Sequence, residues 1–257
     1  MPLTYRYVIT RALAAGLVAG LLLALYTLSV TEPKIDRAIA LEQARTSAQA
    51  HGERLGNDHL EKPLFSRPTQ VGGGMVATVV YAGVVSVIFG TVLASIRHRL
   101  PDWSELGRTA WLAAVAFGVV ALVPAVKYPG NPPGVGDPGT VNERTVQYLV
   151  LVVLSIALAV LLTRLAGWLR SRVDGPTRVV SIAAATVVGY GLLLIAMPGS
   201  PDAIDPAVPA QLVWDFRLRS LGGLALLWAT IGLGLGSELE RAVAREPATT
   251  ELALVRA

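Results

Sequence analysis

The sequence predicts an all-α fold, a polytopic bundle of about six transmembrane helices with a short external helix after the first span. Composition is the first reason: 53% of the 257 residues are hydrophobic and 16% are charged, whereas soluble domains carry about 25% charged residues. Distribution is the second, because the apolar residues lie in uncharged runs of roughly 17 to 26 residues, and about 20 suffice to cross a bilayer. These observations exclude a soluble globular enzyme and a disordered chain.

Six uncharged runs are the predicted spans, and all lie within residues 1–236, which we expect to form a single transmembrane domain. The runs are Ala12–Val30, Val71–Ile96, Thr109–Val126, Thr145–Thr163, Val179–Met197 and Ser220–Gly236. The first run could be a signal peptide, but it is longer than the usual core of about 7 to 15 residues and no A-x-A cleavage site follows, so we expect a retained span. Five glycines in the last run predict close helix packing.

Arginine and lysine in the short loops predict the orientation. Loops 97–108 and 164–178 carry three and four of them, whereas the longer loops 127–144 and 198–219 carry two each. Because positively charged loops stay in the cytoplasm, we expect a cell-membrane protein with both termini inside and a cytoplasmic tail over 237–257.

The external loop 31–70 begins with helix-start signals. Pro33 follows Glu32, and a proline and an acid are typical of the first turn of a helix, so we expect a helix over about 33–50. Three acids of this segment are candidate metal ligands, together with two histidines further along: Glu32, Asp36, Glu42, His51 and His59. Imidazole with carboxylate suits divalent cobalt, nickel or zinc. The histidine spacing is no recognised ligand signature, so an ordinary solvated loop remains the alternative.

Two further loops resemble each other. Each leaves a helix through a proline, continues with prolines and glycines, and reaches an Asp-Pro pair, at Asp137-Pro138 and Asp205-Pro206. The two hairpins are either a duplicated unit or independently proline-rich loops. We expect Asp137 and Asp205 to line one external entrance for a cation, with Lys127 or Arg144 balancing Asp137. The alternative is that the loop ending at Asp137 only caps its hairpin.

Motifs of catalysis are missing from the sequence. It contains no Walker A loop, no GxSxG elbow, no HExxH and no cysteine. The predicted spans hold no ionisable acid, histidine, lysine or arginine, which argues against a self-contained proton-coupled pump. We therefore expect neither an enzyme nor a cofactor, and no nucleic acid as partner.

Four segments together resemble the CbtA family, the cobalt transporter subunits of bacterial membranes. They are the proline-containing segment 30–42, the Arg–Gln–Gly-rich stretch 66–74, the proline-rich loop 127–138 and the approach to the last span at 214–223. The resemblance covers most of residues 12–236, and it rests on the order and spacing of these segments. One departure is the number of spans, since the family is commonly described with five.

The resemblance implies a membrane subunit that takes up divalent cobalt, with cobalt as the transported substrate. It also implies a small His-rich membrane partner of the CbtB type that supplies metal-binding imidazoles. Besides the lipid bilayer and this partner, a homo-oligomer is left open. The rival interpretation is a membrane scaffold that positions a metal-transport partner and does not transport.

Overall fold

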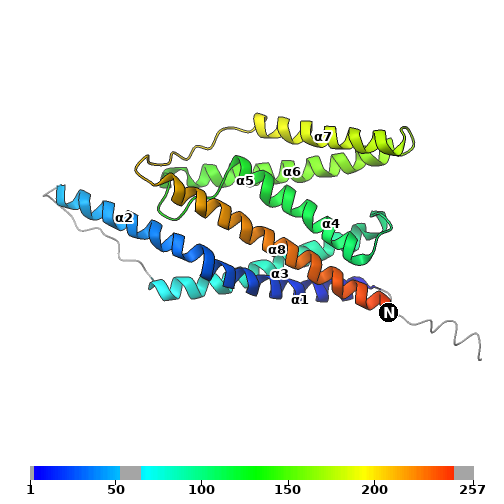
Figure 1. Cartoon of the computed structure of the whole chain (residues 1–257), viewed down its shortest axis with the longest axis horizontal. Coiled ribbons are helices and arrows are strands. Elements are labelled where there is room, and N and C mark those ends of the chain that lie inside the picture. The colour runs from blue at the N-terminus through cyan, green and yellow to red at the C-terminus, as the bar shows by residue number, and fades with distance from the viewer. Residues whose placement is uncertain (1–2, 53–64, 246–257) are drawn as a thin grey trace, which may run out of the picture. The chain divides into compact units, whose positions relative to one another are not determined.

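The computed structural model describes residues 3–52 and 65–245, and within them every regular element is helical (Figure 1). Within these residues, six helices are long and apolar enough to cross a membrane, which confirms the predicted fold class. They are Tyr5–Ala44, Arg67–Arg99, Glu105–Lys127, Val141–Leu169, Gly175–Ala196 and Ala210–Ala244. Five of them extend beyond both ends of the uncharged run predicted for them, and Gly175–Ala196 extends only at its start, because polar residues beyond the runs continue the helical hydrogen bonding.

The elements form two compact units. Of the described residues, unit 1 contains 3–33, 52, 65–116 and 222–245, and unit 2 contains 34–51 and 117–221. In chain order the elements are α1 (Tyr5–Tyr26), η1 (Thr27–Thr31), α2 (Glu32–Gly52), α3 (Arg67–Ile96), η2 (Arg97–Arg99), α4 (Glu105–Phe117), η3 (Gly118–Leu122), α5 (Val123–Lys127), η4 (Pro138–Thr140), α6 (Val141–Leu169), α7 (Gly175–Ala196) and α8 (Ala210–Ala244).

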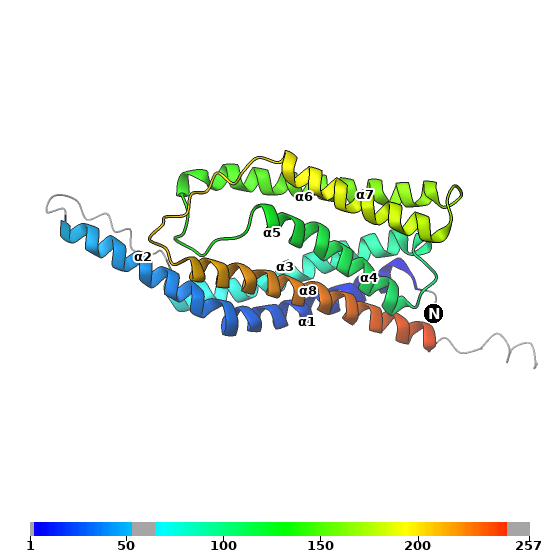
Figure 2. The ribbon, with the colours of Figure 1, turned by 45° about the horizontal axis from the view of Figure 1, so that its top comes forward.

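In unit 1, α1 and α3 lie side by side (Figures 1 and 2) and meet through small residues. A Cβ placed on Gly16 would lie 2.5 Å from the Cβ of Ser86 and 2.8 Å from the carbonyl oxygen of Ala82. The Ser86 hydroxyl donates a hydrogen bond of 2.6 Å to the carbonyl of Ala12, and this bond is buried. Small residues at such contacts let helix backbones approach closely in lipid.

The unit 1 part of α8 packs on α4 and α1 through its glycines. Gly232 lies against Ala113 of α4, and Gly234 lies against Ala15 of α1. The Trp228 ring of α8 meets the Phe89 ring of α3 edge-on, with centroids 6.0 Å apart. The close packing predicted from the glycines of this segment is therefore confirmed.

In unit 2, α6 and α7 form a hairpin whose helices lie side by side (Figures 1 and 2). The Tyr190 hydroxyl of α7 donates to the Ser155 carbonyl of α6 at 3.0 Å. No residue of α7 is buried in the structure, as suits a helix whose surroundings are hydrocarbon. Asp174 caps the start of α7, and hydrogen bonds from the Thr177 side chain and backbone hold the pKa of Asp174 below its usual value.

The helix expected after the first span exists, but it is not a separate short helix. Residues 5–44 form one helix, and α2 continues α1 through the π-helical turn η1. At the end of this turn the backbone N–H of Glu32 donates to the carbonyl of Thr27, five residues back. The wider turn makes room for the ring of Pro33, which in a regular α-helix would meet the carbonyl of Ser29. Pro33 therefore widens the helix where the sequence suggested a new start.

A second π-helical turn, η3, precedes a second proline in the same way. The N–H of Val123 donates to the carbonyl of Gly118, and Pro124 follows. Within unit 2, the carbonyl of Val120, four residues before Pro124, accepts a hydrogen bond of 3.4 Å from the Tyr148 hydroxyl of α6. The Tyr148 side chain thus donates to the Val120 carbonyl, which receives no hydrogen bond from Pro124 because proline has no N–H.

Candidate functional site

The buried carboxylate of Asp202 joins the two proline-rich loops of unit 2. Its Oδ2 accepts hydrogen bonds from Nδ2 of Asn131 at 2.6 Å and from the Arg144 guanidinium at 2.5 Å. Its Oδ1 accepts from the backbone N–H of Asp137 at 2.8 Å. The Asp202 side chain is only 2% exposed. We call this arrangement, with Arg217 described below, the Asp202 clamp.

Glycine shapes the loop that wraps around this carboxylate. Gly134 and Gly136 have φ angles of +72° and +105°, which residues with a side chain rarely adopt. A Cβ on Gly136 would fall on the Asp202 carboxylate, and one on Gly134 would fall on the Glu42 carboxylate of α2. The backbone of this loop therefore approaches both acids so closely that it leaves no room for a side chain.

A small apolar core adjoins the same two loops along the chain. Tyr128, Leu151 and Met197 are buried together, and Tyr128 donates a hydrogen bond of 2.9 Å to the carbonyl of Pro198. Burial raises the pKa of the Tyr128 phenol, which keeps its proton in place for this bond. The loops are thus held by the burial of Tyr128 and Met197 and by the Asp202 carboxylate.

Arginine from α8 extends the clamp. The Arg217 guanidinium donates to Oδ1 of Asn131 at 2.7 Å, so the Asn131 amide bridges Arg217 and Asp202. The Nε atoms of Arg217 and Arg144 are buried without a hydrogen-bond partner in the described part of the chain. On the same unit, Lys34 of α2 and Asp215 of α8 form an ion pair of 2.7 Å. Helices α2, α6 and α8 are therefore each joined to the loops or to one another by charged groups.

The two Asp-Pro pairs adopt the same local structure. Oδ1 of Asp137 accepts from the N–H of Gly139, and Oδ1 of Asp205 accepts from the N–H of Ala207, both at 2.8 Å. The carbonyls of the same aspartates accept from the N–H groups of Thr140 at 3.1 Å and Val208 at 2.9 Å. Each aspartate therefore closes a turn on its own backbone and remains exposed.

The three acids predicted in the segment after the first span all lie on the helix Tyr5–Ala44. Glu32, in unit 1, pairs with Arg67 at 2.5 Å and is largely buried. Asp36 and Glu42 are exposed on α2, with Glu42 beside Gly134. His59 lies outside the described residues, and the structure describes the backbone of His51 but not its side chain. Within the described ranges, no three His, Asp or Glu side chains gather as a metal site.

Asp202 is the residue that the sequence analysis missed. The loops of Asp137 and Asp205 do meet, but through Asp202, and Arg144 pairs with Asp202 instead of balancing Asp137. Since both Asp202 oxygens already accept hydrogen bonds, this carboxylate serves to hold the loops, and the exposed Asp137 and Asp205 remain open to solvent.

Six membrane-length helices, with two loops fixed together at one end of unit 2, define a multi-pass membrane protein. A family model described as probable cobalt transporter subunit (CbtA) matches residues 5–240, which include nearly all of the six helices. The chain belongs to the CbtA family. No curated protein and no solved structure matches the chain. Family membership indicates a transporter subunit, with a membrane context, cobalt as the probable substrate and at least one partner implied.

Proposed function

We propose that this chain is the membrane subunit through which divalent cobalt is taken up into the cell, and that it is not an enzyme. The observation that carries the proposal is the family match over residues 5–240. In this proposal the protein crosses the cytoplasmic membrane with both termini inside, which puts the Asp202 clamp on the outer side. A small His-rich membrane partner of the CbtB type delivers or shares the metal.

Exposed carboxylates in unit 2 support a role in attracting the cation. Asp137 and Asp205 lie in the two loops joined by Asp202, and Glu42 lies beside one of these loops. Carboxylates on one surface raise the local concentration of a hydrated cation and speed its arrival. Because the clamp fixes the loops, these charges keep a constant arrangement at no further entropic cost on binding.

The membrane potential supplies enough free energy for uptake. Two positive charges that move inward through 100 mV gain about 4.6 kcal/mol. Because about 1.4 kcal/mol corresponds to a tenfold ratio, this supports a cobalt gradient of more than a thousandfold. A path lined by hydroxyl groups and backbone carbonyls could therefore concentrate cobalt without a chemical energy source of its own.

Cobalt uptake by proteoliposomes tests the proposal. We expect vesicles with this chain and its chromosomal neighbours to accumulate cobalt when an inside-negative potential is imposed, and vesicles without the chain to accumulate none. If the neighbours alone transport at the full rate once they are stably inserted, the chain is a scaffold and the proposal is wrong.

The exposed acids give a second readout in the same assay. Neutralising Asp36, Glu42, Asp137 and Asp205 with Asn or Gln should raise the half-saturating cobalt concentration, and the difference should shrink as salt screens the charges. Glu32 is left unchanged because Arg67 is its partner. At Asp137 and Asp205, replacement by Asn preserves the turn and removes the charge, whereas replacement by Glu preserves the charge and disturbs the turn. If uptake falls in the Glu variants but not in the Asn variants, attraction by charge is contradicted.

A further inference from the structure

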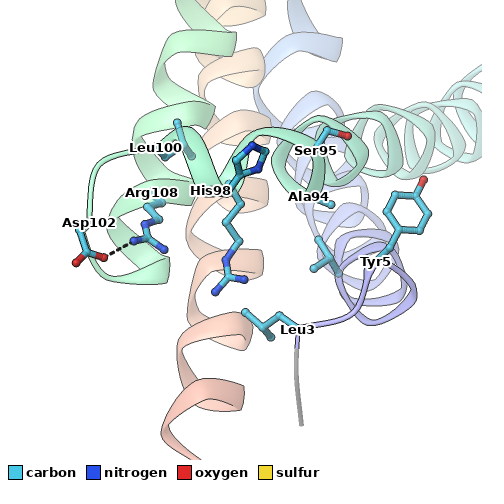
Figure 3. A pocket seen from close by; sticks show the side chains of 10 residues that line it. Leu3, Tyr5, Ala94, Ser95, His98, Leu100, Asp102 and Arg108 are labelled. Atoms are coloured by element: carbon cyan, nitrogen blue, oxygen red, sulfur yellow. Dashed lines mark hydrogen bonds and ion pairs between the residues drawn. The ribbon is translucent and has the colours of Figure 1, made fainter. Parts of the chain in front are cut away.

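A pocket at one end of unit 1 is independent of the Asp202 clamp. It has a volume of about 570 Å³ and lies between the start of α1, the end of α3, the turn η2 and the start of α4. In Figure 3, Leu100, Asp102 and Arg108 lie on one side of His98, and Tyr5, Ala94 and Ser95 lie on the other. Sequence analysis assigned only an excess of positive charge to this region.

Fixed cations form one wall of the pocket. Nε and NH2 of Arg97 donate to the two carboxylate oxygens of Glu105 at 2.8 and 2.7 Å, and Glu105 is 8% exposed. Arg108 shares this carboxylate at 3.0 Å and pairs with Asp102 at 2.6 Å. Both guanidinium groups are therefore held in place before any ligand arrives, which lowers the entropic cost of binding.

The charge of this end of unit 1 is positive. In the segment 95–108, three arginines face two acids, so one positive charge remains without counting His98. Arg6, in the first turn of α1, adds another. Nε of Arg99 donates to Nε2 of His98 at 3.3 Å, which brings a further guanidinium close to the pocket. On α8, Glu238 and Glu240 reach the same end, and Arg241 and Arg245 balance them in number. An anionic group entering the pocket therefore meets a net positive field.

Part of the lining is apolar, and two tryptophans follow it along the chain. Leu3, Val8 and Ala94 line the pocket beside the cations. Trp103 and Trp111 pack edge-on with centroids 6.4 Å apart, yet they remain 49% and 41% exposed. Exposed tryptophan at the ends of spanning helices is typical of the membrane–water interface. The pocket thus combines a cationic wall with an apolar wall at the depth of lipid headgroups.

We propose that this pocket binds the phosphate headgroup of an anionic phospholipid. The phosphate would lie against His98 and the guanidinium of Arg97, and the upper acyl chain against Leu3, Val8 and Ala94. Basic pockets between spanning helices are known to select anionic lipid headgroups. The proposal does not depend on metal transport, since it concerns only how unit 1 is held in the bilayer.

Lipid retention by the full chain tests this proposal. The protein is purified in a neutral detergent, and phosphatidylglycerol or phosphatidylcholine is added and counted by native mass spectrometry. We expect retention of phosphatidylglycerol over phosphatidylcholine. The pocket variants H98E and S95E should each lower it about fivefold, the effect of roughly 1 kcal/mol from one charge near the lipid surface. The control S171E places the same charge on an exposed turn of unit 2 and should retain lipid within about twofold of the unmodified chain.

The other outcomes overturn the proposal. Equal retention of the two lipids, or equal losses in the pocket variants and S171E, would show that the headgroup is not recognised here. Full competition by inorganic phosphate or glycerol phosphate at millimolar concentration would make the pocket a site for a free phosphate. Because two pocket variants are used, misfolding of one of them leaves the other to decide.

Discussion

At the scale of single residues, Asp202 joins segments of unit 2 that lie far apart in the sequence. Its carboxylate accepts hydrogen bonds from two side chains and one backbone N–H, and these donors lie 58 to 71 residues away along the chain. A buried acid with three donors holds its partners more firmly than an exposed one, because water cannot replace the bonds.

Replacement of Asp202 by Asn should destabilise the protein. The change removes the charge opposite Arg144 and points an amide donor at other donors, so we expect a loss of roughly 2 to 3 kcal/mol. Thermal unfolding in detergent measures it as a shift of several degrees. D205N is the control, since Asn can still close the exposed turn at that position and should shift unfolding little. Equal shifts for the two variants would show that Asp202 does not hold the loops.

Replacement of Gly136 by Ala should also destabilise, for a different reason. The backbone there has φ of +105°, and the new Cβ would meet the Asp202 carboxylate, so we expect a cost of about 2 kcal/mol. Gly130 provides the matched control in the same loop, because its φ is not positive and a Cβ there would meet nothing within 4 Å. The G130A midpoint should stay close to that of the unmodified chain, and a similar fall for both variants would contradict the geometry.

The sequence singled out the two loops but not Asp202, the aspartate that joins them. Asp137 and Asp205 stand before prolines, and this pattern correctly marks two turns of the same kind. Asp202 lies in the same loop three residues earlier, with no motif around it. Its importance comes from Asn131 and Arg144, which fold onto it from far along the chain, and a single sequence does not reveal that contact. Arg144 and Arg217 were visible as charges at helix starts, but their partners were not.

At the scale of elements, close helix contacts in unit 1 depend on positions where only glycine fits. Gly16 of α1 faces Ser86 and the backbone of Ala82 at distances shorter than a real Cβ contact. Packing energy in lipid comes from such close approach, since there is little hydrophobic effect to drive helices together. The run of three glycines at the start of α3 is the opposite case, because nothing lies within 4 Å of their Cβ positions.

Alanine in place of Gly16 should therefore push α1 and α3 apart. We expect a loss of about 1 to 3 kcal/mol from overpacking, measured as a lower unfolding temperature and faster amide exchange in both helices. G73A is the control in α3, and it should leave stability unchanged or raise it by up to about 1 kcal/mol through better helix propensity. A stable G16A variant with slow exchange would mean that α1 and α3 do not pack as described.

Helix boundaries were predicted less well than helices. Every helix extends beyond at least one end of its predicted uncharged run, into residues that include charged ones. Pro33 predicted the start of a new helix, whereas the chain continues as one helix through η1. Proline usually interrupts a helix, and only the wider hydrogen-bonded turn before Pro33 and Pro124 allows the helix to pass. Whether a chain breaks or widens at proline depends on neighbours such as Tyr148, which the local sequence does not contain.

At the scale of the whole molecule, the six uncharged runs predicted the six membrane-length helices of the described residues, because a helix that crosses hydrocarbon needs a long apolar run whatever its packing. The orientation is a prediction that labelling can decide. Ser171 and Ser200 lie at opposite ends of α7 and both are exposed. With a chain that has no native cysteine, S200C should react with an impermeant thiol reagent in intact cells, and S171C should react only after the membrane is opened. The reverse pattern would invert the topology.

The Asp202 clamp also sets an order on the biosynthesis of the protein. Asn131 and its partner Arg217 are 86 residues apart. At a synthesis rate of about 5 to 20 residues per second, the ribosome needs roughly 4 to 17 s to add the intervening chain. The loop around Asn131 lacks the Asp202 carboxylate for the first 71 residues of this stretch and the Arg217 guanidinium for all 86. A nascent chain that stalls before residue 202 therefore keeps the loop around Asn131 open, because the carboxylate that joins the two loops has not yet been made.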